Sequence, residues 1–294
     1  DRTRWSERIA EIGPGEALKE LRLAYNDVDD FRIQHTSVHV FGELLYDRFG
    51  LQGLEFCNDS FNSGCYHAFL GKAIAKEKTR VFSQIAHLCG SGKRTQTNCF
   101  HGVGHGLVAY FGYEENDLLP ALTECDLLSP SQANSCQQGT FMEYNFRLLQ
   151  HGPNIFLGEI RPLKDDPQKP CSALPEKFRA SCYYSQPNWW KNVFHRDFKK
   201  IGTFCAELNE PEKTQCFLGT GKDIAWLFPK NVTHAKNICD TMPGHDDMLT
   251  CRSGAALAIL TRTGDEALAQ SMCSGLGLRD QEICLARFEL ARKQ

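Results

Sequence analysis

Six side chains in the first half of this sequence could bind a metal ion or move a proton. They are five histidines and one glutamate: His35, His39, His67, His101, His105 and Glu143. Four of the histidines form two pairs with a spacing of four residues, which places both imidazoles of a pair on one face of a helix. Neutral imidazole binds zinc, copper and iron well, so these residues predict a transition-metal site with one or two ions.

The single carboxylate of this set indicates what such a site could do. Beside zinc, Glu143 could be a ligand or the general base that takes a proton from metal-bound water. With copper or iron, two groups of three ligands could hold two ions that bind or activate oxygen; the groups are His35, His39 and His67, and His101, His105 and Glu143. Glu43, one helical turn after His39, is a further candidate ligand or a partner that orients an imidazole.

The chain of 294 residues contains 14 cysteines, which fall into seven couples whose members are 8 to 12 positions apart. No couple has the C-x-x-C spacing of zinc knuckles, iron–sulfur proteins or thioredoxin-like motifs. Local disulfides therefore explain the couples best, and disulfides persist in an oxidising compartment. The couples are Cys57 and Cys65, Cys89 and Cys99, Cys125 and Cys136, Cys171 and Cys182, Cys205 and Cys216, Cys239 and Cys251, and Cys273 and Cys284.

Other features of the composition agree with export and argue against two classes of partner. Two N-x-[ST] sequons, at Asn58 and Asn231, are candidate glycosylation sites of a secreted, periplasmic or extracellular protein. The first residue is Asp1 rather than Met, so we expect a processed or trimmed chain. The net charge of −3 and the scattered basic residues argue against nucleic acid as the main partner. No apolar run reaches the roughly 18 residues of a membrane helix.

The cysteine couples recur with a regular period. The first cysteines of successive couples are separated by 32, 36, 46, 34, 34 and 34 residues. In each unit an apolar helical segment ends near the first cysteine, a polar turn follows, and the second cysteine opens another apolar helix, as in CFLGTGKDIAWLF. Strand patterns are scarce. The sequence therefore predicts an all-α fold: an array of αα-hairpins, as a solenoid or a compact curved bundle, with about seven units, an N-terminal helical cap and one local disulfide in each unit.

From residue 57 to residue 294 this arrangement resembles tetratricopeptide and Sel1-like repeats in its period and its pairing of helices. The tetratricopeptide Trp/Leu/Gly/Tyr pattern is not present, so the resemblance concerns the fold. The runs HTSVHVFGE, CYHAF and CFHGVGHGL also resemble a group of exported Cys/His sequences with no known activity.

Alignment of the units on their second cysteine separates scaffold residues from candidate site residues. The third position after this cysteine is small in six of seven units, as at Gly102 and Gly139, which indicates close packing of neighbouring helices. His101 and His105 occupy columns where later units accept residues such as leucine, serine or alanine, so the repeat does not require the histidines, which are additions to it. The segment FRIQHTSVHVFGELLYDRFG resembles the second helix of a unit, and we align its histidine pair with His101 and His105. Equivalent columns of stacked units line one surface, so all six candidate residues should converge.

The chain divides into three parts in this interpretation. Residues 1–150 contain the cap and the first three units with the histidine-rich site, residues 151–170 form an insertion loop, and residues 171–294 contain units four to seven, continuous with the first part. Insertions in repeat arrays form loops, often on the binding face, so this one could cover the metal pocket or be a tolerated surface loop. After it, we expect Pro187 to break the helix in CYYSQPNWW, and the aromatic residues there to pack the loop rather than line a groove for a peptide or sugar.

Two classes of function follow from these features. The first is an exported, disulfide-stapled repeat protein with a His/Glu transition-metal site, favoured as a metal-dependent hydrolase or oxidoreductase. The second is a non-catalytic interaction or structural protein whose repeat surface binds another protein or a second copy of itself; the units after the insertion carry no obvious chemistry and suit that role. The remaining histidines are expected to be ordinary polar residues: His87, His151, His195, His234 and His245.

Overall fold

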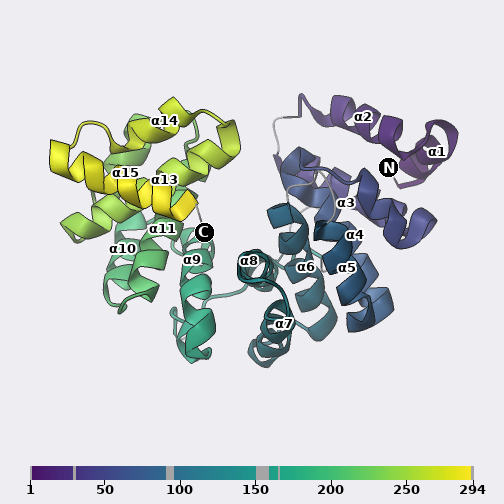
Figure 1. The fold of residues 1–294 in the computed structure, drawn as a ribbon, viewed down its shortest axis with the longest axis horizontal. Coiled ribbons are helices and arrows are strands. Elements are labelled where there is room, and N and C mark those ends of the chain that lie inside the picture. The colour runs from purple at the N-terminus through teal and green to yellow at the C-terminus, as the bar shows by residue number, and fades with distance from the viewer. Residues whose placement is uncertain (1, 29–30, 91–95, 150–158, 165, 293–294) are drawn as a thin grey trace. The chain divides into compact units, whose positions relative to one another are not determined.

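The protein is all-helical in a computed structural model that describes residues 2–28, 31–90, 96–149, 159–164 and 166–292. Within these ranges the chain forms α-helices and short 3₁₀-helices and contains no strand (Figure 1). The prediction of an all-α fold is confirmed. Two compact units can be distinguished, residues 1–161 and residues 162–294, and each is described by itself. Their boundary falls inside the segment that the sequence marked as an insertion.

The first unit opens with two helices that precede the cysteine couples, α1 (Arg2–Ile12) and α2 (Pro14–Tyr25). The elements that follow are α3 (Phe31–Phe49), η1 (Gly50–Phe56), α4 (Ser60–Glu77), η2 (Lys78–Val81), α5 (Phe82–Gly90), α6 (Gln96–Phe111), η3 (Glu115–Asp117), α7 (Leu118–Cys125) and α8 (Pro130–Phe146).

The second unit repeats the alternation of a short helical segment and a long helix. Its elements are η4 (Cys171–Ala173), α9 (Glu176–Val193), α10 (Phe198–Ala206), α11 (Glu212–Leu227), α12 (Val232–Cys239), α13 (His245–Thr263), α14 (Glu266–Gln270), η5 (Ser271–Cys273) and α15 (Leu278–Arg292).

In both units the long helices pack against one another in chain order. In the first unit α3 packs on α4, α4 on α6 and α6 on α8, and in the second unit α9 packs on α11, α11 on α13 and α13 on α15. This arrangement is consistent with a helical repeat array.

All seven predicted cysteine couples are disulfides of the structure. Each bond ties a long helix to the shorter segment before it, as α6 is tied to α5 and α11 to α10. The local pairing inferred from the spacing is therefore confirmed. The bonds are Cys57–Cys65, Cys89–Cys99, Cys125–Cys136, Cys171–Cys182, Cys205–Cys216, Cys239–Cys251 and Cys273–Cys284.

Glycines let the long helices approach closely. A Cβ atom on Gly139 of α8 would collide with the carbonyl of His101 in α6, and one on Gly254 of α13 would collide with the carbonyl of Leu218 in α11. Both glycines lie three positions after the second cysteine of their hairpin. Glycine in a helix costs about 1 kcal/mol relative to alanine, and close helix packing offsets this cost. The packing role predicted for this column is therefore confirmed.

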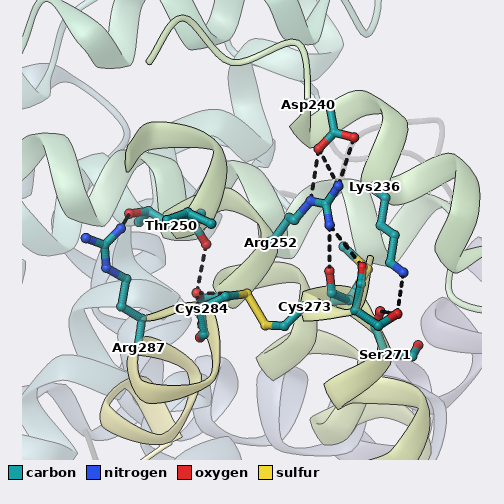
Figure 2. Close-up of a disulfide and its surroundings, with 12 residues drawn as sticks. Lys236, Asp240, Thr250, Arg252, Ser271, Cys273, Cys284 and Arg287 are labelled. Carbon is teal, nitrogen blue, oxygen red and sulfur yellow. Dashed lines mark hydrogen bonds and ion pairs between the residues drawn. A yellow bond between two sulfur atoms is a disulfide. The ribbon is translucent and has the colours of Figure 1, made fainter. Parts of the chain in front are cut away.

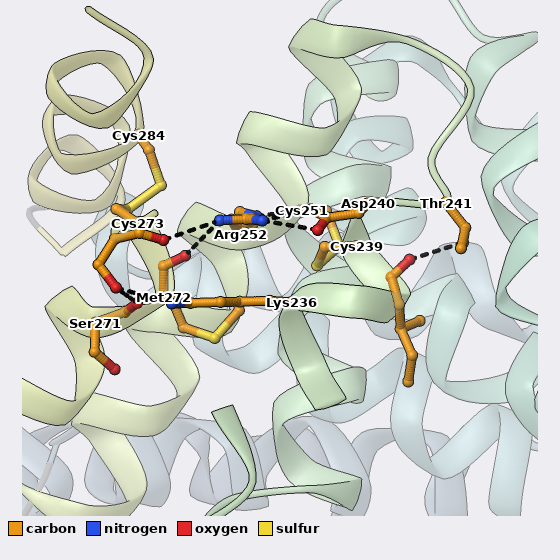
Figure 3. Close-up of polar contacts among 12 residues, drawn as sticks. Lys236, Cys239, Asp240, Thr241, Cys251, Arg252, Ser271, Met272, Cys273 and Cys284 are labelled. Atoms are coloured by element: carbon orange, nitrogen blue, oxygen red, sulfur yellow. Dashed lines mark hydrogen bonds and ion pairs between the residues drawn. A yellow bond between two sulfur atoms is a disulfide. The ribbon is translucent and has the colours of Figure 1, made fainter. Parts of the chain in front are cut away.

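A buried arginine joins the last two hairpins of the second unit (Figure 3). The guanidinium of Arg252, a residue of α13 that is 6% exposed, donates to both carboxylate oxygens of Asp240, at 2.6 and 2.8 Å. It also donates to the carbonyl of Met272 at 3.3 Å, beside the Cys273–Cys284 disulfide (Figure 2). A buried charge is costly unless it is paired, and here the pairing links α12, α13 and η5.

Pro187 lies inside a continuous helix. Helix α9 runs through it from Glu176 to Val193, so the prediction that Pro187 breaks the helix is wrong. The tertiary packing explains this result, because Trp189 and Trp190 are both fully buried. Burial of two aromatic side chains offsets the roughly 3 kcal/mol that a proline inside a helix costs. Trp190 Nε1 donates to the Pro167 carbonyl at 2.8 Å. Trp190 thus packs against the segment before α9, as expected for the aromatic residues of this run.

Candidate metal centre

The register of α3 against α4 shows which histidines are equivalent in the repeat. A Cβ atom on Gly42 of α3 would collide with the carbonyl of Cys65, the second cysteine of the next hairpin. In the same way, a Cβ atom on Gly104, which lies five positions after Cys99, would collide with the carbonyl of Cys136. Gly42 and Gly104 therefore occupy the same position of the repeat.

This equivalence corrects the alignment that the sequence suggested. His39 corresponds to His67 and His101, so α3, α4 and α6 each present one imidazole at the same position. His35 lies one turn before this position in α3, and His105 lies one turn after it in α6. The predicted match of the pair His35 and His39 with the pair His101 and His105 was one turn out of register, because α3 has no cysteine to mark its place.

The five imidazoles form one continuous cluster around His67. The ring centroid of His67 lies 5.1 Å from that of His35, 5.7 Å from that of His39, 5.5 Å from that of His101 and 4.3 Å from that of His105. Ligand atoms of His35, His39 and His67, here called the first triad, lie within 4.8 Å of one another. The same holds for His67, His101 and His105, the second triad. The structure thus brings all five histidines together as two groups that could each hold a metal ion.

In the first triad, a backbone carbonyl fixes the imidazole of His35. Nδ1 of His35 lies 2.7 Å from the carbonyl oxygen of Phe61. Because a carbonyl only accepts, Nδ1 carries the proton and Nε2 keeps its lone pair. This Nε2 lies 3.0 Å from Nε2 of His39. Two nitrogens bound to one tetrahedral zinc ion would be about 3.3 Å apart, so the observed spacing is close to that of a chelating pair.

The carbonyl of Phe61 reaches His35 because the first turn of α4 is irregular. Phe61 and Ser63 have φ values of 50° and 59°, a left-handed conformation that costs non-glycine residues roughly 1–2 kcal/mol each. Gly64 follows, and a Cβ atom there would lie 3.0 Å from Nδ1 of His35. Sequence reasoning missed Phe61 because its contribution is a carbonyl group, which every residue has. The glycine beside Cys65 was the one signal of a close approach.

In the second triad, Glu143 of α8 fixes the imidazole of His105. Glu143 Oε2 accepts a hydrogen bond from His105 Nδ1 at 2.7 Å, and both side chains are fully buried. Glu143 Oε1 accepts from the hydroxyl of Tyr113 at 2.7 Å and from the backbone N–H of Leu149 at 2.8 Å. The lone pair of His105 is therefore on Nε2, which is buried without a hydrogen-bond partner among the described residues. A carboxylate that accepts from the far nitrogen is the usual way to orient a metal-binding histidine.

Glu143 and Glu43 make contacts that differ from those expected from the sequence. Both oxygens of Glu143 accept from protein donors, which favours a positioning role over the ligand and general-base roles expected from the sequence. Tyr113, which sequence reasoning missed, lies beyond the repeat columns, just after the end of α6. Glu43 accepts from Arg2 of α1 at 2.5 Å, which favours a role in holding α1 on α3.

Burial favours the neutral form of three imidazoles of the cluster. His39, His67 and His105 are at most 5% exposed, whereas His101 is partly exposed. Loss of hydration lowers the pKa of His35 and His105, and it lowers the pKa of His67 well below its usual range, with neighbouring imidazoles adding to the effect. Neutral imidazole is the form that binds a metal, so protons compete weakly for these nitrogens.

Residues on both sides of the segment 150–158 contact the end of α8. Leu149 donates to Glu143, as described, and Nε of Arg161 donates to Oδ1 of Asn145 at 2.9 Å. Residues 150–158, with His151, lie outside the described residues. That this loop covers the metal pocket therefore stays a prediction. Glycosylation of Asn58 and Asn231 likewise stays a prediction.

No helix in the described part of the chain combines the length and apolar character needed to cross a membrane.

Comparisons with protein-family models, with curated proteins and with solved structures find no match. The function is therefore inferred from the chemistry of the site.

Proposed function

We propose that this protein binds zinc, copper or iron in its five-histidine cluster and uses the metal as a hydrolase or an oxidoreductase. The nitrogen-only ligand set favours these metals over calcium and magnesium, which prefer oxygen. The seven disulfides fit an oxidising compartment, which supports a secreted or periplasmic location.

The buried nitrogens that lack partners carry this proposal. Nδ1 of His67 and Nε2 of His105 are both buried and have no hydrogen-bond partner among the described residues. A buried polar atom without a partner costs roughly 1–3 kcal/mol. Without a bound ion the cluster therefore carries this cost at two nitrogens, whereas an ion would satisfy the same nitrogens. This comparison favours a ligand set over the hydrogen-bonded packing that is the alternative explanation of the cluster.

The same geometry supports a catalytic use of the metal. Three imidazoles for one ion leave a coordination position for water or substrate, as in catalytic zinc sites. A bound ion would supply Lewis acidity, an activated water or, for copper and iron, redox chemistry. Burial favours the neutral form of His35, His67 and His105. The protein also fixes two imidazoles, that of His35 through Phe61 and that of His105 through Glu143. His101 is partly exposed, so the cluster has access to solvent on this side.

Elemental analysis tests the proposal directly. Protein purified without a metal-affinity resin is analysed by inductively coupled plasma mass spectrometry, beside the variants His67→Ala and His87→Ala. His67 belongs to both triads, whereas His87 is an exposed histidine of α5 and serves as the matched control. We expect a stoichiometric transition metal in the wild type and the control, and a loss of at least tenfold in affinity for His67→Ala. A wild type that stays metal-free after zinc, copper and iron are added would leave the cluster as polar packing in an interaction or assembly protein.

A further inference from the structure

Each triad has its own support from the protein. In the first triad the Phe61 carbonyl orients His35, and in the second triad Glu143 orients His105, both through Nδ1 at 2.7 Å. These supports act at the two ends of the cluster, on α3 and α6. Partners of this kind accompany individual metal ligands, so two of them on separate triads indicate two ligand sets.

Five imidazoles also exceed what one ion of this type takes from a protein. Zinc sites use four ligands, and catalytic ones use three protein ligands with one open position. Two sets of three need six nitrogens, and the five rings supply them only if one ring serves both ions. His67 is placed for this role, because its ring contacts each of the other four and it belongs to both triads.

We infer that the cluster holds two metal ions, one in each triad, and that His67 bridges them with one ring nitrogen on each ion. This inference rests on the proposed metal binding. A bridging imidazole must give up its remaining N–H proton, which leaves to solvent when the second ion binds. The imidazolate formed in this way and the Glu143 carboxylate offset part of the charge of two divalent ions in a buried site.

The tilts of the rings give the order of binding. The ring of His67 makes angles of 65° with His35 and 80° with His39, whereas it stacks on His105 at only 24°. An imidazole ligand holds its ion in the plane of the ring, so nearly parallel stacked rings do not share an ion until one of them turns. The first triad is therefore ready to bind, and the second triad binds after a change in ring tilt.

Titration of metal-free protein with Cu²⁺, followed by electron paramagnetic resonance and elemental analysis, tests this inference. In the wild type and in His87→Ala we expect two equivalents. The signal should grow up to the first equivalent and fall as the second binds, because an imidazolate bridge couples the two copper spins. His105→Ala should keep one tight copper with a lasting signal. His35→Ala should keep one copper, bound at least tenfold more weakly than the first copper of the wild type.

Two results would overturn the bridge while leaving metal binding intact. One is saturation of the wild type at one equivalent, and the other is two copper ions whose signals add without coupling. Failure to bind copper or zinc at all would instead remove the proposed function on which the inference rests. Circular dichroism of each variant shows whether it has kept the helical fold.

Discussion

Replacement of Glu143 by glutamine should weaken metal binding by reversing the tautomer of His105. Oε1 of Glu143 accepts two hydrogen bonds, from Tyr113 and from the Leu149 backbone, so the single oxygen of a glutamine would stay on that side. The NH₂ group of the new glutamine would then face Nδ1 of His105 and donate to it. Nδ1 would become the acceptor and the proton would move to Nε2, the nitrogen that is available to a metal in the wild type.

The size of this effect follows from the role of the contact. Loss of a partner that orients a metal-binding histidine typically reduces metal affinity by about 10- to 100-fold, or roughly 1.4–2.7 kcal/mol of binding free energy. Competition of Glu143→Gln with a chelator of known zinc affinity measures this change for the second equivalent of zinc, the one that the second triad holds. Glutamine has nearly the volume of glutamate, so the buried packing around α8 should persist, and thermal unfolding of the metal-free proteins checks that it does.

Glu43→Gln is the matched control for this experiment. Glu43 lies at the repeat position of His105 but pairs with Arg2, so its replacement should change zinc affinity less than twofold. Equal affinity of Glu143→Gln and wild type for the second equivalent of zinc would refute the positioning role of Glu143. A larger loss in Glu43→Gln than in Glu143→Gln would show that the sequence-based suggestion of Glu43 as a ligand was right.

Three further predictions concern stability and the first triad. Gly64→Ala should lower the melting temperature and weaken metal binding, since its Cβ would lie 3.0 Å from Nδ1 of His35; Gly15→Ala, with open space around it, should not do either. Removal of the Cys239–Cys251 disulfide by alanine substitution should cost about 3 kcal/mol of unfolding free energy in denaturant titrations, and an unchanged unfolding free energy would contradict this. Burial lowers the pKa of cluster imidazoles, so the metal-free folded state binds fewer protons than the unfolded state. Its melting temperature should therefore fall as the pH drops below about 6.5, and a flat profile between pH 8 and 5 would contradict this.

The helical hairpins were predictable because their constraints are local. Cysteines 8 to 12 positions apart can approach to the Cα–Cα distances of 5.4 to 5.7 Å seen here only if the chain turns back between them. The small residue three positions after the second cysteine in six of the seven units likewise indicated helix contacts. Pro187 was misjudged because its helix is stabilised by the burial of Trp189 and Trp190, which no local pattern reveals.

The sequence by itself determined the residue types of the candidate site, the seven disulfides and the helices that carry the histidines. Only the tertiary structure decided that His39, His67 and His101 are equivalent, that two triads share His67, and that Glu143 faces Nδ1 of His105. The physical reason is the register of the packed helices. A shift of one turn moves a side chain by about 5.4 Å, more than twice a metal–nitrogen bond, and that register is set by close contacts such as those of Gly42 and Gly104.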